Sequence, residues 1–189
     1  MLASVPTNCR FEVDDAEDEW TYSHKFDFIH WRMLFSCFKD PAGVIAKAFD
    51  FLNPGGYLEA MDVVLPLESV DDSLTSTALG EWCPKLIDGA NVLGKDWTCT
   101  KKYQKYMTDA GFVDVQVVEY KWPTNPWAKS ADQKILGKWL QQNLLDGVSG
   151  MSMAALTRGL KMTAAEVELF LVDVRNDIKD RRIHAFVPV

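Results

Sequence analysis

Three polar side chains with acid–base chemistry stand at or near the ends of apolar segments. His30 ends the segment 26–30, Asp62 ends the segment 57–62, and His184 lies in a third apolar run. Ligands of open α/β sheets bind beyond the carboxyl ends of the strands, where such groups accept or donate protons. His30, Asp62 and His184 are therefore the predicted catalytic residues. For His30 the alternative is a buried histidine whose hydrogen bonds are satisfied in the core.

Aromatic and methionine side chains form the second group of candidates. The sequence contains 7 tryptophans, which suggest either a well-filled core or a pocket for a large apolar ligand. The predicted substrate-binding residues are Trp31, Met33, Trp82, Tyr103, Tyr106, Met107, Trp122 and Trp127. An aromatic stripe at helical spacing is more often core, which is the alternative for Tyr103 and Tyr106. Trp122 and Trp127 flank a Pro-Thr-Asn-Pro loop, where a structural role is as plausible as a lid.

Motifs for other kinds of chemistry are absent from these residues. The 3 histidines form no ligand motif with cysteines or carboxylates, so no metal is predicted. There is no G-x-S-x-G nucleophile motif and no G-x-G-x-x-G loop. The pair Gly55-Gly56 precedes a strand, whereas a phosphate cradle stands between a strand and a helix. We therefore predict no cofactor.

The composition is that of an ordinary globular protein, with 48% hydrophobic and 25% charged residues. A net charge of −7 disfavours nucleic acids and anionic membranes as partners, because phosphate binding needs a basic face. We find neither a signal peptide nor an apolar run long enough to span a membrane. The predicted location is the cytoplasm, where the 4 scattered cysteines would be reduced and buried.

A strand–helix–strand unit between residues 26 and 62 is the centre of the predicted fold. Residues 26–30 are aromatic and β-branched, as in a buried strand. Asp40-Pro41 has the residue types of a helix start, and Asn53–Gly56 ends that helix before the strand 57–62. This order predicts a right-handed parallel crossover, and hence an α/β fold class.

The remaining elements extend this unit into one domain, residues 1–189. Helices are predicted over 72–90 (kinked or divided by Pro84), over 101–110, from about 135 to near Gly147, over 153–160, and from the capping box Thr163–Glu166. Strands are predicted at 10–13, at 112–120, where the pattern is clearest, and at 183–187, with a loop at 122–127. The predicted architecture is a Rossmann-like, mostly parallel sheet with extra helices.

An acidic cluster, residues 14–19, lies between the predicted strand 10–13 and Trp20. Such clusters are most often solvated loops. The alternative is a ligand-binding loop after a strand, in which an aspartate accepts a hydrogen bond from ribose or adenine.

Five segments together resemble the fungal LaeA-like family of S-adenosylmethionine (SAM) dependent methyltransferases of secondary metabolism. They are DDAEDEW (14–20), FDFIHWRML (26–34), LNPGGYLEAMD (52–62), AGFVDVQVVEYKWPTNPW (110–127) and DVRNDIKDRRIHAFVPV (173–189). The resemblance implies that Asp15 and Ala16 lie beside the SAM adenine. It also implies that His30 and Arg32 lie near the methyl donor.

The same resemblance implies family parts that these residues do not contain. In the family, a first strand, a glycine-rich SAM loop, a helix and an acidic second strand come before the segment that resembles residues 10–20. We therefore expect a truncated fold in which only Asp15 and Ala16 remain of the SAM site. The strand 26–30 would then be an open apolar edge. A homodimer through residues 26–38, with a contribution from 10–13, is expected, and coverage by the chain's own N-terminal residues is the alternative.

Two classes of function follow from this interpretation. The first is a SAM-independent enzyme of fungal polyketide biosynthesis, a cyclase that forms a ring by a Diels–Alder-type or lactone-forming reaction. Holding the ends of an apolar substrate together can contribute roughly 7–11 kcal/mol. The second class is a SAM-dependent methyltransferase, a fragment of one, or a non-catalytic regulatory partner in secondary metabolism.

Overall fold

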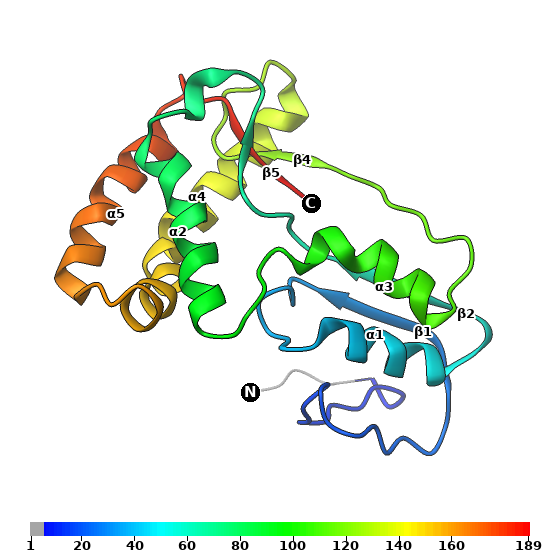
Figure 1. Ribbon diagram of the computed structural model, residues 1–189. Helices are drawn as coiled ribbons and strands as arrows, with labels where there is room; N and C mark the ends of the chain where they lie inside the picture. Colours follow the sequence, from blue (N-terminus) through cyan, green and yellow to red (C-terminus); the bar gives the residue numbers. More distant parts are fainter. Residues whose placement is uncertain (1–5) are drawn as a thin grey trace.

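A computed structural model describes residues 6–189, which form two regions (Figure 1). One contains β1, β2, α1 and α3, and the other contains α2, α4 and α5 with a second sheet. The strands are β1 (Phe26–Arg32), β2 (Leu52–Met61), β3 (Glu68–Ser69), β4 (Lys121–Pro123) and β5 (Ala185–Pro188). The helices are α1 (Pro41–Asp50), α2 (Ala78–Val92), α3 (Tyr103–Ala110), α4 (Ala131–Ala154) and α5 (Ala164–Lys179). Short 3-10 turns span Asp72–Leu74 and Cys99–Lys102, and a π-helical turn spans Ala155–Gly159.

The predicted strand–helix–strand unit is present. β1 and β2 are parallel, and their register sets His30 opposite Glu59 and Trp31 opposite Ala60. The Asp40 side chain caps α1 by accepting a hydrogen bond from the Gly43 N–H at 3.0 Å. α1 and α3 pack together on one face of the strand pair. The α/β class and its parallel strand pair are thus confirmed.

The other three strands form an antiparallel sheet in the order β3-β5-β4. β5 is the central strand, and all four of its residues are buried. It packs against the core of α2, α4 and α5, which includes the fully buried Leu79, Leu156 and Leu171. The capping box at Thr163 and Glu166 begins α5, as the sequence predicted. This second sheet therefore belongs to the helical region and not to the β1–β2 pair.

Two predicted strands are absent. Residues 112–120 form no strand, and Val113 and Val117 are 84% and 68% exposed. Backbone pairing begins at Tyr120, which exchanges hydrogen bonds with Val189 at 2.8 and 2.9 Å, and it continues along β5 from Lys121. Residues 10–13 also form no strand, and their apolar side chains are exposed.

The helix boundaries also differ from prediction. Pro84 lies inside a continuous α2. The predicted helix 72–90 is instead interrupted at 75–77, and Thr77 caps the start of α2. Gly147 does not end α4, which continues through it to Ala154 because the buried face of the helix extends to Val148 and Ser152. Packing overrides local propensity at both positions.

Two further predictions concern the burial of the cysteines and the absence of a membrane-spanning segment. Cys83 and Cys99 are buried as predicted, but Cys9 and Cys37 are exposed, because they lie in loops outside both cores. Within residues 6–189, no helix has the length and apolar character needed to cross a bilayer.

Candidate functional site

Asp62 is a carboxylate buried at the end of β2 and surrounded by hydrogen-bond donors. Asp62 is only 6% exposed. Oδ2 accepts hydrogen bonds from Trp31 Nε1 and from the Tyr103 hydroxyl, both at 3.1 Å, and Oδ1 accepts one from the Phe35 N–H at 3.1 Å. We call Asp62, Trp31, Phe35 and Tyr103 the Asp62 cluster. It joins β1, β2, α3 and the loop after β1.

The electrostatics of the cluster are dominated by burial. Desolvation raises the pKa of Asp62 above its usual value, although the donors from Phe35, Tyr103 and Trp31 act in the opposite direction. Burial, with the negative charge of Asp62 nearby, raises the pKa of the Tyr103 phenol. The phenol therefore keeps its proton and donates a hydrogen bond to the carboxylate. Both Asp62 oxygens accept hydrogen bonds, which fix the carboxylate relative to Trp31, Phe35 and Tyr103.

The loop between β1 and α1, residues 33–40, is held by carboxylates at both ends. Asp62 holds its first half through the Phe35 N–H. Glu17 holds its second half, because Oε1 accepts hydrogen bonds from the N–H groups of Lys39 and Asp40 at 2.7 Å each. The acidic segment thus connects to the same loop as the Asp62 cluster. In an α/β fold this loop lies at the carboxyl end of the first strand, where ligands bind.

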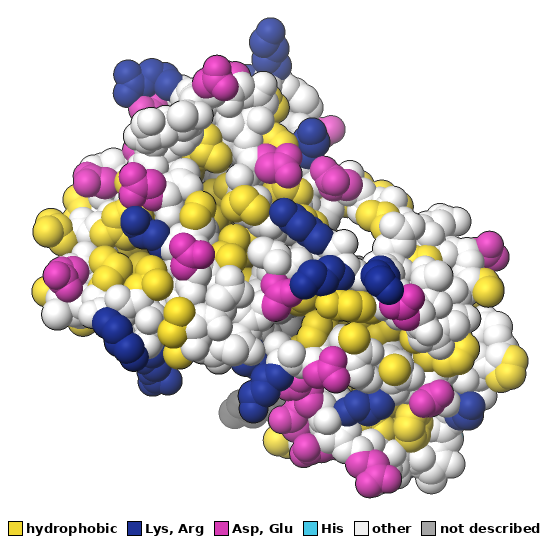
Figure 2. All heavy atoms as spheres, viewed as in Figure 1, with side chains coloured by type: hydrophobic (Ala, Val, Ile, Leu, Met, Phe, Trp, Pro, Cys, Tyr) yellow, Lys and Arg dark blue, Asp and Glu magenta, His cyan; other side chains and the backbone are white. Residues whose placement is uncertain are grey.

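The acidic cluster is an ordered loop. Lys47 of α1 donates from Nζ to the carbonyl oxygens of Ala16, Glu17 and Asp18, at 2.6 to 3.2 Å. Trp20 donates from Nε1 to the Ala16 carbonyl at 3.0 Å, and its ring packs against Phe51 at 5.4 Å. Acidic side chains gather around this loop in the lower part of Figure 2. The loop therefore has the fixed backbone that a ligand-binding loop needs.

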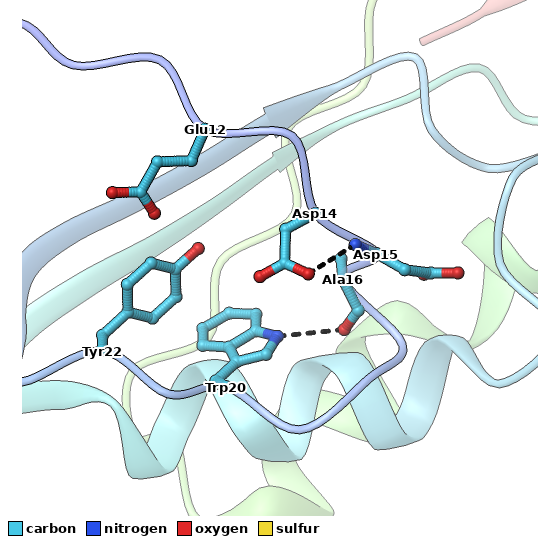
Figure 3. Close-up of a pocket in the computed structure, with 6 residues that line it drawn as sticks. All are labelled: Glu12, Asp14, Asp15, Ala16, Trp20 and Tyr22. Atoms are coloured by element: carbon cyan, nitrogen blue, oxygen red, sulfur yellow. Dashed lines mark hydrogen bonds between the residues drawn. The ribbon is translucent and has the colours of Figure 1, made fainter.

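This loop lines the acidic-loop pocket, a half-open surface pocket of about 170 Å³. Its lining residues are Glu12, Asp14, Asp15, Ala16, Trp20 and Tyr22. Figure 3 shows the Asp14 carboxylate directed toward the rings of Trp20 and Tyr22, with the Asp15 side chain turned away. One Asp14 oxygen accepts the Asp15 N–H at 2.9 Å, and one Asp15 oxygen accepts the Glu17 N–H at 2.9 Å. The pocket combines flat rings with a carboxylate acceptor.

The two predicted catalytic histidines lie apart from Asp62, each with its own acidic partner. His30 Nδ1 is 2.8 Å from Glu59 on the exposed face of β1 and β2, so it is not a buried histidine. His184 Nδ1 is 2.6 Å from Asp71, next to β5. Hydrogen bonds from Ser73, followed by the contact with His184, lower the pKa of Asp71. The structure does not bring the three predicted residues into one hydrogen-bonded group.

The predicted aromatic residues are divided among several surroundings. Trp31 and Tyr103 belong to the Asp62 cluster, and Tyr106 and Met107 pack beside it. Trp82 is buried in the helical core, where Nε1 donates to Ser152 at 2.8 Å, and Met33 and Trp122 pack against the same core. Trp127 lines a second cavity of about 170 Å³ with Val70, Lys121, Pro123, Ala128, Gln133 and Phe186. These side chains do not surround a single cavity in the described chain.

Several residues of these sites were not predicted from the sequence. Trp20 and Lys47 hold the acidic loop, and Tyr22 lines its pocket. Glu17 holds the loop 33–40, and Phe35 contributes only its backbone N–H to the Asp62 cluster. The one available signal was Trp20, an aromatic residue directly after the acidic run. Beside the Asp62 cluster, Trp97 Nε1 and Thr100 Oγ1 are buried without a hydrogen-bond partner in the described chain. In the same residues, no group of three His, Cys, Asp or Glu side chains could hold a metal ion.

The family model and several curated relatives that match this chain are all methyltransferases by their descriptions. Residues 4–117 match the family model described as methyltransferase domain. The chain is 32% identical over 179 residues to the probable methyltransferase tdiE of Emericella nidulans, covering 94% of this chain and 56% of that protein. It is 30% identical to the methyltransferase pytC of Aspergillus terreus (96% and 56%) and 28% identical to the secondary metabolism regulator LAE1 of Cochliobolus heterostrophus (96% and 61%). The chain thus spans a little over half the length of these curated relatives.

Proposed function

The chain belongs to the methyltransferase-domain family, and we propose that it supplies the adenosine-binding part of a SAM site in a methyltransferase of fungal secondary metabolism. The observation that carries this proposal is the acidic-loop pocket. The resemblance to the LaeA-like family implies that Asp15 and Ala16 lie beside the adenine, and both line this pocket. The biosynthetic setting comes from the relatives, which include a secondary metabolism regulator and methyltransferases of fungi.

The pocket fits the adenine ring of an adenosine group in size and in chemistry. An engineered cavity of about 150 Å³ holds benzene, so a pocket of about 170 Å³ has room for a flat ring but not for all of SAM. Trp20 and Tyr22 offer aromatic surfaces for a purine. Asp14 has an oxygen without a partner in the described residues, which can accept from an amino or ribose hydroxyl group.

Bound SAM would supply an electrophilic methyl group on its sulfonium. The contribution of this chain is to hold the adenosine end and to fix the loop 33–40, through Glu17 and Asp62. His30 and Arg32 stand at the end of β1, which is where the family resemblance sets the methyl donor. The predicted roles of His30, Asp62 and His184 in acid–base chemistry stay predictions.

Isothermal titration calorimetry with S-adenosylhomocysteine, adenosine and methionine tests the proposal. We expect S-adenosylhomocysteine to bind tighter than about 100 μM, or roughly 5.5 kcal/mol, and adenosine to compete with it. Methionine should neither bind nor compete. Absence of binding by both adenosine and S-adenosylhomocysteine would overturn the proposal.

A second candidate function is the SAM-independent cyclase. One observation favours it: the second cavity of about 170 Å³ is lined mainly by apolar side chains, among them Val70 and Phe186. An apolar substrate would then have to enter a cavity such as the one beside Trp127. If no adenosine compound binds, while an apolar polyketide shifts the thermal midpoint of the protein, this second function replaces the first.

A further inference from the structure

The second cavity, which we call the Trp127 pocket, belongs to the helical region. It has a volume of about 170 Å³, and apart from Lys121 and Gln133 its lining side chains are apolar. In Figure 1, β4 and β5 lie in the upper part of the molecule, whereas the blue segment that forms the acidic-loop pocket lies at the bottom. A ligand of the Trp127 pocket would therefore be separate from an adenosine group in the acidic-loop pocket.

The antiparallel sheet and Trp127 give this pocket two aromatic walls. Pro123 of β4 lies opposite Phe186 of β5 in the register, so their side chains share one face of the sheet. Lys121 lies two residues before Pro123 and shares that face. Trp127 is fixed because its Nε1 donates to the Ala185 carbonyl at 2.7 Å. The rings of Phe186 and Trp127 both line the pocket, whose shape is therefore preformed.

Lys121 brings a positive charge to the pocket. Its Nζ lies 4.7 Å from the centroid of the Phe186 ring, close enough for a cation–π contact. Within residues 6–189 this ammonium group makes neither an ion pair nor a hydrogen bond, and the side-chain amide of Gln133 makes no hydrogen bond either. Both groups can donate, so the pocket has donors for an anion beside its apolar walls.

We propose that the Trp127 pocket binds a small aromatic carboxylate, with its ring against Trp127 and Phe186 and its carboxylate at Lys121 Nζ. A cavity of about 150 Å³ holds benzene, so about 170 Å³ has room for one six-membered ring. A carboxylate only accepts hydrogen bonds, and its bond to an ammonium group is charge-assisted. A neutral aromatic compound would leave the ammonium group without a partner, and an aliphatic acid would leave the aromatic walls uncovered. The proposal does not depend on the adenosine site.

Fluorine NMR with 4-fluorobenzoate at pH 7 tests the proposal on the whole chain. We expect saturable binding with a dissociation constant below about 5 mM, and at least fivefold weaker binding of the uncharged 4-fluorobenzamide. Proton NMR of the histidines locates the site, because the His184 ring packs against Trp127 at 5.2 Å and should shift on binding, whereas His30 should not. Absence of saturable binding, equal affinity for the amide, or an unmoved His184 signal would overturn the proposal.

Two pairs of variants separate the roles of charge and shape. K121Q should weaken binding of 4-fluorobenzoate at least fivefold, whereas K129Q removes a nearby charge that does not line the pocket and should bind as the wild type does. V70W fills the pocket from a 58% exposed position and should abolish binding, whereas V172W, at a 50% exposed position on α5, should not. Far-UV circular dichroism of each variant confirms that the fold is kept.

The result is independent of the adenosine proposal, because the titration contains no adenosine compound. Folded K121Q or V70W that binds 4-fluorobenzoate as tightly as the wild type would contradict the assigned pocket. Failure of S-adenosylhomocysteine to bind would overturn the proposed function and leave the affinity for 4-fluorobenzoate unchanged.

Discussion

The Tyr103 hydroxyl donates a hydrogen bond to Asp62 Oδ2 at 3.1 Å and thereby ties α3 to the end of β2, 41 positions away in the sequence. Trp31 donates to the same oxygen from β1. The buried carboxylate is thus the point where two parallel strands, a helix and the loop 33–40 meet. Removing any one donor changes the surroundings of all the others.

Tyr103→Phe should lower the free energy of unfolding by about 1.5–3 kcal/mol. The reason is the loss of a hydrogen bond to a buried, charged acceptor. Urea denaturation measures the change. Tyr106→Phe is the matched control, because the Tyr106 hydroxyl makes no hydrogen bond in the described chain and its loss should change stability by less than about 0.5 kcal/mol. Equal effects of the two variants would contradict the assigned role of Tyr103.

Asp62→Asn should change how stability depends on pH. Because burial raises the folded-state pKa of Asp62, the folded protein binds the proton more tightly than the unfolded chain does. The contribution of this group is therefore fully present below the unfolded value near 3.8 and is lost as pH rises through the folded pKa. The wild type should gain stability relative to D62N as the pH falls toward 4. Parallel stability curves for the two proteins would refute this.

Gly89→Ala should destabilise the helical region by about 1–3 kcal/mol. A Cβ at Gly89 would lie 2.3 Å from the Ala155 carbonyl oxygen, and backbone atoms there cannot move aside. Gly150→Ala is the control within α4, because its Cβ would have no neighbour within 4 Å. That change should stabilise by about 0.5–1 kcal/mol through helix propensity. Thermal unfolding of both variants gives the comparison, and a stabilising G89A would contradict the close α2 contact.

Glu17→Ala should release the loop 33–40. Its carboxylate accepts two backbone hydrogen bonds, so the amides of Lys39 and Asp40 should exchange with solvent about tenfold faster in the variant. Hydrogen exchange measured by NMR tests this, with the Phe35 amide as internal reference because Asp62 holds it independently. Unchanged exchange at Lys39 and Asp40 would show that Glu17 does not hold the loop.

Local sequence patterns correctly predicted those helices and strands whose tertiary packing favours the same conformation as the local sequence. The Asp40-Pro41 helix start, the β1–α1–β2 unit and the capping box at Thr163 follow from short-range chemistry, and all three are present. Residues 112–120 have an equally strong strand pattern and form no strand, because strand formation depends on a partner that composition does not reveal.

The contacts within the candidate site could not be predicted from local sequence patterns either. The sequence analysis singled out Asp62 as a catalytic residue and Trp31 and Tyr103 as substrate-binding residues, and only the three-dimensional structure joins them. The acidic run was interpreted as either a solvated loop or a ligand loop. Its ordered form depends on Lys47, which lies 29 to 31 positions away and carries no local signal.

The most direct test of the proposed function is the affinity of S-adenosylhomocysteine for two tryptophan variants. W20A removes an aromatic wall of the acidic-loop pocket, and W139A removes a tryptophan that is 73% exposed on α4. We expect W20A to weaken binding at least tenfold, in line with about 1–3 kcal/mol for a stacked base, and W139A to bind as the wild type does. Equal affinities of W20A, W139A and wild type would contradict an adenosine site in this pocket.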